Sequence, residues 1–230
     1  MEHNEKHFTG SEQIQDIVIG MSDGLTVPFA LTAGLSGAVA SNHIVITAGV
    51  AEIIAGSIAM GLGGYLAGKT AYDHYYAELK REYLEVEVVP EREKQEIEDI
   101  LADYGISADT KKAFVDELAQ DKDKWVQFMM KFELGLEEPV LNRARNSAMT
   151  IAAAYVIGGL VPLTSYFFTK NPEEGLKYSV AVTLAALLAF GFFKNKAIGE
   201  NPWTGAIRTA FIGAIAAGAA YFIAKLVSGI

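Results

Sequence analysis

The chain contains no cysteine in its 230 residues. Disulfide bonds, thiolate metal sites and cysteine nucleophiles are therefore excluded. Histidine is scarce: there are four, and none stands three residues after a glutamate, so the paired Glu-x-x-His motifs of a membrane-bound di-iron oxidase are missing. Lysine and arginine gather in no basic patch, which leaves nucleic-acid binding without support.

Apolar and acidic side chains are both abundant, but they occupy different parts of the chain. Hydrophobic residues make up 51% of the sequence, which also has 22 glycines, and the mean hydropathy is positive. The net charge of −9 arises in residues 71–140, which hold 19 of the 28 acidic and 9 of the 19 basic residues. The sequence therefore joins an apolar, membrane-type part to one acidic block.

Five apolar stretches are long enough to cross a bilayer, which takes about 20 residues of helix. They run over residues 17–39, 44–68, 148–168, 176–193 and 206–226. The first dozen residues are polar, and we expect no cleavable signal peptide. The predicted fold is all-α: an integral membrane protein with five transmembrane helices and a helical domain inserted between the second and third.

The expected domains are a first transmembrane hairpin (1–70), an acidic helical domain (71–146) and transmembrane helices three to five (147–230). The turn at 40–43 carries no lysine or arginine, whereas these residues flank the acidic domain and occur in the loop at 194–208. Lysine and arginine are enriched in cytoplasmic loops. The amino terminus and the acidic domain are therefore predicted to lie in the cytosol, and the carboxyl terminus outside.

The acidic domain has the periodicity of helices rather than strands. Residues 72–88 continue the second span until Pro90 interrupts them. Further helices are expected over 91–104, 108–120 and 124–136. Together they predict a small soluble bundle, joined to the membrane by a helix that extends out of it.

Two carboxylates lie well inside predicted spans, Asp23 in the first and Glu52 in the second. A charge there costs several kcal/mol unless it is paired, hydrated or bound to a cation, so such residues usually line ion or proton paths. Met60 lies two turns beyond Glu52 near the same helix face. Pro28 should kink the first span and free backbone carbonyls. The alternative is that both acids are protonated or bonded to a neighbouring helix for packing alone.

The acidic domain also offers side-chain pairs at helical spacing, in which both members share one face. The pairs are Glu82 with Glu85, Glu93 with Glu96, and Met129 with Glu133. Clustered carboxylates repel one another and a divalent cation relieves the repulsion; oxygen ligands with a thioether suit iron(II) or manganese better than calcium. Acidic pairs are also common on solvated helix faces, and periodicity does not choose among them.

Several blocks of the sequence resemble the vacuolar iron transporter family, and together they extend over nearly the whole chain. The blocks are residues 22–30 (SDGLTVPFA), 51–52 (AE), 60–65 (MGLGGY), 78–82 (ELKRE), 128–136 (FMMKFELGL) and 158–162 (GGLVP). The resemblance implies a homodimer of five-span subunits with a cytosolic three-helix metal-binding domain. Such a protein exports ferrous iron, and often manganese, from the cytosol in exchange for protons.

The resemblance also implies which residues handle the metal. The translocation residues would be Asp23, Glu52 and Met60. The cytosolic metal cluster would consist of Glu82, Glu85, Glu93, Glu96, Met129 and Glu133, with Met130 adjacent. We therefore expect divalent metal ions, protons and the lipid bilayer as partners, no prosthetic group and no enzymatic activity.

A membrane-anchored metal sensor or buffer that does not transport remains the alternative function. It would account for the acidic domain but not for Asp23 and Glu52. The expected location is the plasma membrane of a prokaryotic-type homologue, or the vacuolar membrane if the source is eukaryotic.

Overall fold

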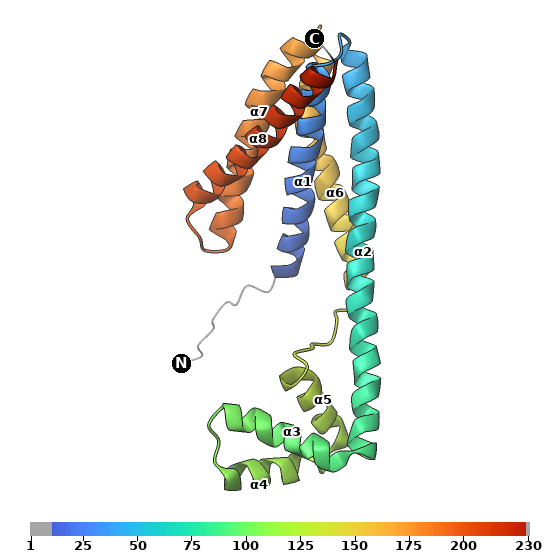
Figure 1. The fold of residues 1–230 in the computed structure, drawn as a ribbon, viewed down its shortest axis with the longest axis vertical. Coiled ribbons are helices and arrows are strands. Elements are labelled where there is room, and N and C mark those ends of the chain that lie inside the picture. The colour runs from blue at the N-terminus through green and yellow to red at the C-terminus, as the bar shows by residue number, and fades with distance from the viewer. Residues whose placement is uncertain (1–10, 229–230) are drawn as a thin grey trace. The chain divides into compact units, whose positions relative to one another are not determined.

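The computed structural model describes residues 11–228, and within them it contains helices but no strand. Eight α-helices follow one another in this range (Figure 1). They are α1 (Ser11–Ser36), α2 (Asn42–Val88), α3 (Pro90–Asp103), α4 (Ala108–Leu118), α5 (Lys122–Phe132), α6 (Arg143–Phe167), α7 (Pro172–Ala197) and α8 (Pro202–Ser228). The all-α prediction is confirmed. Residues 1–10, which carry most of the argument about a signal peptide, lie outside the described residues.

Five of the helices in residues 11–228 are long and apolar enough to span a membrane: α1, α2, α6, α7 and α8. The shorter helices α3, α4 and α5 come between the second and third of them. The chain is therefore a multi-pass membrane protein with a helical segment inserted where the sequence predicted it.

Helix α2 is much longer than a bilayer requires. Its 47 residues extend for about 70 Å at 1.5 Å per residue, against a hydrocarbon core of about 30 Å. The apolar part of the helix is residues 44–68, and this part alone is long enough for one crossing. The expected continuation of the second span into the acidic domain is confirmed.

The fourth span is longer than the 18 residues expected at 176–193, because α7 has 26 residues. Asn171 caps its first turn by accepting a hydrogen bond from the Glu174 backbone N–H at 2.9 Å. Pro172 is the first residue of the helix, a position where a backbone N–H would have no partner within the helix. Lys194 and Lys196 occupy the last turn, where cations interact favourably with the helix dipole. Hydropathy detects the apolar middle of such a helix and omits its polar ends.

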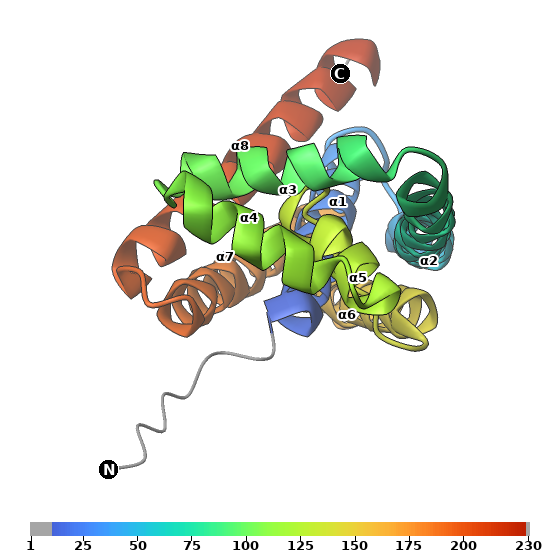
Figure 2. The same cartoon turned by 90° about the horizontal axis from the view of Figure 1, so that it is seen from below.

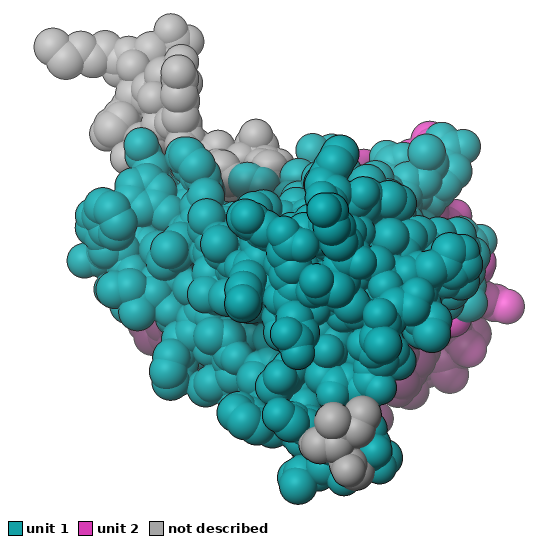
Figure 3. All heavy atoms as spheres, turned by 90° about the horizontal axis from the view of Figure 1, so that it is seen from above, with its two compact units in different colours: residues 1–65, 144–230 teal, residues 66–143 magenta. Residues whose placement is uncertain are grey.

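The chain divides into two compact units (Figure 3). The membrane unit comprises residues 1–65 and 144–230, and the acidic unit comprises residues 66–143. Each unit has its own packing.

In the membrane unit, glycines bring α1 and α6 into backbone contact. A Cβ placed on Gly20 would meet the Ile151 carbonyl oxygen, one on Gly24 would meet the Tyr155 carbonyl oxygen, and one on Gly158 would lie 2.9 Å from the Leu25 nitrogen. Larger residues at these positions would force the helices apart, as expected for small residues at membrane helix interfaces.

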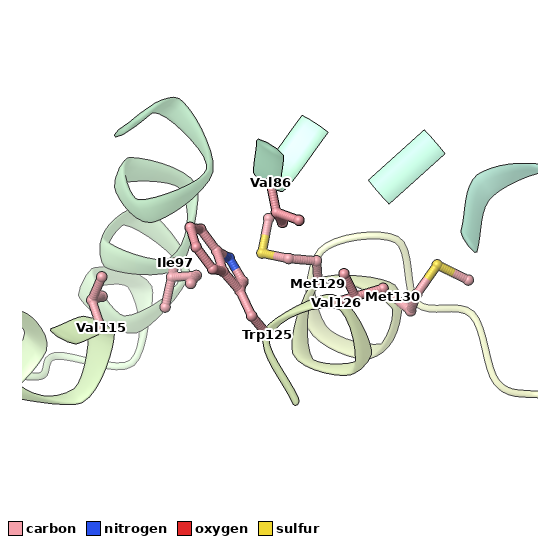
Figure 4. Packing of buried hydrophobic residues seen from close by; sticks show 7 residues of the cluster. All are labelled: Val86, Ile97, Val115, Trp125, Val126, Met129 and Met130. Carbon is pink, nitrogen blue, oxygen red and sulfur yellow. The ribbon is translucent and has the colours of Figure 1, made fainter. Parts of the chain in front are cut away.

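In the acidic unit, the end of α2 and helices α3, α4 and α5 enclose an apolar core; Figure 2 shows α4 beside both α3 and α5. The core consists of Val86, Ile97, Val115, Trp125, Val126, Met129 and Met130 (Figure 4). Pro90 is the first residue of α3, so it starts this helix as well as ending the preceding one. Gly105 follows α3 with φ +76°, a left-handed conformation that glycine adopts without strain.

Helix α5 ends at Phe132, four residues before the predicted end at 136. Gly135 has φ +64°, and the Leu136 N–H donates to the Met130 carbonyl at 2.8 Å. Glycine adopts this left-handed conformation without strain after the end of a helix. The turn places Glu133 directly after the helix.

Candidate metal sites

Three glutamates from three helices converge in the acidic unit. Glu82 lies on α2, Glu93 on α3 and Glu133 directly after α5, and one carboxylate oxygen of each lies within 4.8 Å of the others. The side chains of Glu82 and Glu93 are only 3% exposed, whereas Glu133 is exposed. The arrangement is a three-carboxylate cup that is open on the Glu133 side.

The fold explains why residues far apart in sequence meet here. Glu82 and Glu93 are separated by the break at Pro90, where α2 ends and α3 begins in a new direction. Glu133 is held by its backbone N–H, which donates to the Met129 carbonyl at 3.0 Å. Each glutamate is thus fixed at a helix end or near a helix break.

The three carboxylates have unusual electrostatics. Burial, followed by repulsion from Glu133 and other glutamates, raises the pKa of Glu82 to about 7. Burial and then the neighbouring carboxylates likewise raise the pKa of Glu93 to about 7, and burial raises the pKa of Glu133. Desolvation and like charge both disfavour the ionised form. A bound cation would remove both penalties.

One oxygen of each buried glutamate has no hydrogen-bond partner among the described residues. These oxygens are Oε2 of Glu82 and Oε2 of Glu93. Buried polar atoms are normally paired, so unpaired ones require an explanation. Carboxylate oxygens converging in this way suit a hard or borderline divalent cation.

Glu85 and Glu96, the other predicted acidic ligands, lie half-buried beside the cup. Glu85 accepts a hydrogen bond from Arg81 Nε at 3.1 Å, and Glu96 accepts one from Arg92 Nε at 3.1 Å. Both glutamates act electrostatically on Glu93. The structure therefore brings all five predicted glutamates together but binds these two to arginines, a feature that pairwise spacing missed.

The two predicted methionine ligands lie in the apolar core. Met129 is 0% and Met130 2% exposed. Figure 4 shows the Met129 side chain beside Val86 and Trp125, with Met130 directed away from it. Adjacent residues on a helix point in different directions, so the two thioethers do not face one point. Their role as ligands stays a prediction.

In the membrane unit, Asp23, Glu52 and Met60 are all partly buried. The Tyr155 hydroxyl, from α6, donates a hydrogen bond to Oε1 of Glu52. Glu52 Oε2 has no partner within the part of the chain described. Asp23 lies close enough to act electrostatically on Tyr155. The two predicted acids thus share a neighbour that sequence reasoning did not identify.

Tyr155 is fitted tightly between α1 and α2. A Cβ on Gly24 would collide with its backbone carbonyl, and a Cβ on Gly56 would collide with its hydroxyl. Nothing in the sequence marks one tyrosine of an apolar span as the partner of a glutamate on another span. The only indication in the sequence is a glycine on each neighbouring helix, Gly24 and Gly56, which leaves room for a large side chain.

Asp16 is a further acidic residue that the sequence analysis missed. It is 4% exposed and accepts a hydrogen bond from the Ser147 hydroxyl of α6 at 2.9 Å. It precedes Asp23 by seven residues, two helical turns, so both lie on one face of α1. The predicted span began at residue 17 and excluded it, although the seven-residue spacing was available as a signal.

Comparison with known proteins agrees with this arrangement. Residues 14–225 match the VIT family. The chain is 53% identical over 229 residues to vacuolar iron transporter 1 of Tulipa gesneriana and 54% identical over 229 residues to vacuolar iron transporter 2 of Oryza sativa subsp. japonica. These alignments cover 100% of this chain and 93% of each relative.

The similarity extends to a fungal protein. Protein CCC1 of Saccharomyces cerevisiae is 43% identical over 221 residues, covering 93% of this chain and 68% of the relative. These relatives are from plants and a fungus, so they give no support to the narrower expectation of a prokaryotic-type homologue. The plant relatives are named as transporters, in agreement with the expectation that the chain is not an enzyme. By the extent of these matches, the chain belongs to the VIT family.

Proposed function

We propose that the protein exports ferrous iron, with manganese as a second substrate, from the cytosol in exchange for protons. The names of its plant relatives support iron as the cargo. The observation that carries the proposal is the glutamate cup of the acidic unit, whose buried oxygens lack a hydrogen-bond partner among the described residues. A divalent ion of the iron or manganese type fits such oxygen ligands.

The acidic unit captures the metal from the cytosol in this mechanism. Glu82, Glu93 and Glu133 provide the first oxygens. Glu85 and Glu96, which act electrostatically on Glu93, are proposed to complete the coordination. Met129 and Met130 are the proposed sulfur ligands, and they would have to turn out of the core to bind the metal. Capture concentrates the ion on the protein.

The ion then crosses the bilayer past Asp23, Glu52 and Met60. A carboxylate that binds metal when ionised releases it when protonated, so protons arriving from the acidic side displace the ion. Competition of this kind gives antiport, provided that access to the site alternates between the two sides. The Tyr155 hydroxyl holds one oxygen of Glu52 and leaves the other for the cargo.

Two copies of the chain form the transporter in this proposal. The membrane-spanning part of α2 has a row of exposed apolar side chains, among them Ile54, Ile58 and Leu62. Such a face suits either lipid or a second subunit, and the family resemblance favours the subunit. The receiving side is an acidic compartment, for which the relatives' names indicate a vacuole.

The decisive experiment is iron(II) uptake into proteoliposomes with an acidic lumen, comparing the wild type with Asp23→Ala. We expect uptake that depends on the pH gradient and is lost in the variant. Metal binding without gradient-driven uptake by the wild type would instead favour the sensor or buffer. A gradient-independent uptake would retain transport but reject antiport.

A further inference from the structure

A short motif occurs twice around the glutamate cup. Arg-Glu-x-x-Glu stands at residues 81–85, near the end of α2, and again at 92–96, in the first turns of α3. The two copies are eleven residues apart and lie on either side of Pro90. Because of the break at this proline, the first glutamate of each copy, Glu82 or Glu93, contributes a carboxylate to the cup.

Both copies have the same geometry. The first glutamate of each, Glu82 or Glu93, is buried, and each has one oxygen without a partner in the described residues. The second glutamate, Glu85 or Glu96, accepts a hydrogen bond at 3.1 Å from the arginine one turn before it. Each motif thus provides one buried carboxylate with an unpaired oxygen and one carboxylate that is bound to an arginine.

The arginines also act on the cup as a whole. Both Arg81 and Arg92 lower the pKa of Glu133, against the larger effect of burial, which raises it. They are the cations that face this carboxylate from α2 and α3. Their side chains are 63% and 75% exposed, so each can swing into water at little cost. Exposed ion pairs at this helical spacing are individually weak.

We propose that Arg81 and Arg92 are displaceable counterions of the metal site. They hold Glu85 and Glu96 beside the cup and release these carboxylates to an arriving divalent cation. The inference rests on the proposed function, because it takes the glutamate cup as the capture site. Competition from the arginines weakens metal affinity, and a transporter needs a capture site that also lets its cargo go.

A purely structural role is the competing explanation, since ion pairs one turn apart stabilise helices wherever they occur. The same unit offers a matched comparison. Lys94 pairs with Glu91 at 2.8 Å on the same helix as Arg92, but the Glu91 side chain is 85% exposed. Removing Lys94 should change helix stability as much as removing Arg92 does, without touching the cup.

The test is Mn²⁺ binding by the full-length protein in detergent, measured by isothermal titration calorimetry. Arg81→Gln and Arg92→Gln should each tighten the dissociation constant about threefold, and the double variant about tenfold, from the lost repulsion between guanidinium and metal. Added salt should weaken binding more steeply in the double variant than in the wild type. Arg81→Lys, which keeps the charge, should bind nearly as the wild type does.

Two controls make the result decisive. Lys94→Gln should leave the affinity unchanged, and the double variant Glu82→Gln, Glu93→Gln measures any Mn²⁺ bound elsewhere. Unchanged or weaker binding in both arginine variants, with normal wild-type binding, overturns the counterion role alone. Absence of Mn²⁺ binding at the cup of the wild type overturns both this role and capture by the acidic unit.

Discussion

The two units hold their acidic side chains in opposite ways. In the membrane unit, Glu52 and Asp16 each accept a hydrogen bond from a hydroxyl of α6, donated by Tyr155 and Ser147. In the acidic unit, Glu82 and Glu93 are surrounded by further carboxylates, which repel them. Each member of the first pair is thus held in part by a hydroxyl group of α6, while like charges destabilise the second pair.

This difference indicates a division of labour. A carboxylate positioned by hydroxyl groups keeps its place whether it holds a proton or a metal ion, which suits a path where the two exchange. A cluster of carboxylates in mutual repulsion is stabilised when a cation binds, which suits capture. If the two units divide the work in this way, substitutions in one unit should affect transport and substitutions in the other should affect metal binding.

The largest effect is expected from Glu52→Gln. It removes the charge that exchanges metal for protons, so gradient-driven iron uptake into proteoliposomes should fall by about a hundredfold or more. A metal ion that loses a charged ligand inside the bilayer is destabilised by a few kcal/mol. Mn²⁺ binding by the acidic unit should stay within about twofold, since that unit has its own core and its own glutamates, and sites that share no partner behave independently.

Glu173→Gln, in the first turn of α7, is the matched control and should transport normally. If Glu52→Gln transported as well as the wild type, Glu52 would be a packing residue, and the assignment of proton–metal exchange to the membrane unit would be wrong.

A smaller effect is expected from Tyr155→Phe, which removes only the hydroxyl that holds Glu52. Loss of a group that orients a metal ligand typically costs 10–100-fold in metal affinity. We therefore expect the KM for iron(II) to rise about tenfold with a smaller change in Vmax. Tyr178→Phe, on an exposed tyrosine of α7, serves as control. An unchanged KM would show that the hydroxyl does not act through Glu52.

The sequence was sufficient for the architecture but not for these contacts. Runs of about 20 apolar residues and the interruption at Pro90 report on local chain properties, and the five spans and the inserted helices followed from them. The predicted span in α1 began at residue 17, after the helix itself begins, and the predicted span in α7 omitted both ends of that helix. Polar helical turns have the same low hydropathy as loops, so hydropathy does not detect them. That error removed Asp16 from consideration.

Side-chain partners depend on how helices pack, which helical periodicity does not contain. Helical spacing predicts the same role for Glu82 and Glu85. In the structure Glu82 is buried among carboxylates, whereas Glu85 is bound to Arg81. Spacing also could not show that Met129 and Met130 lie inside the apolar core. The Tyr155 partner of Glu52 required the crossing of α6 with α2.

Metal affinity of the acidic unit should depend on pH around neutrality. The pKa values of Glu82 and Glu93 are about 7, and both must ionise to bind metal. The Mn²⁺ affinity should therefore rise about tenfold between pH 6.5 and pH 7.5 and level off above pH 8. Calorimetry in buffers of different ionisation enthalpy should detect proton release at pH 6.5. A flat affinity with no proton release would contradict the raised pKa values.

The smallest effect concerns the stability of the metal-free protein, and it has the opposite sign. Because burial and repulsion raise the pKa of Glu82 from about 4.5 to about 7, its contribution to stability is complete below pH 4.5 and is lost as the pH rises through 7. Glu82→Gln should therefore stabilise the metal-free protein at pH 8, by about 2 kcal/mol, and have little effect at pH 4.5.

Thermal unfolding with a chelator at the two pH values measures this difference, and added Mn²⁺ should stabilise the wild type more than the variant. The matched change in the membrane unit, Ser147→Ala, should instead destabilise the protein at both pH values, because it removes a hydrogen bond to the buried carboxylate of Asp16. Equal behaviour of the two variants would mean that hydroxyl-bound and mutually repelling carboxylates do not differ as the two units suggest.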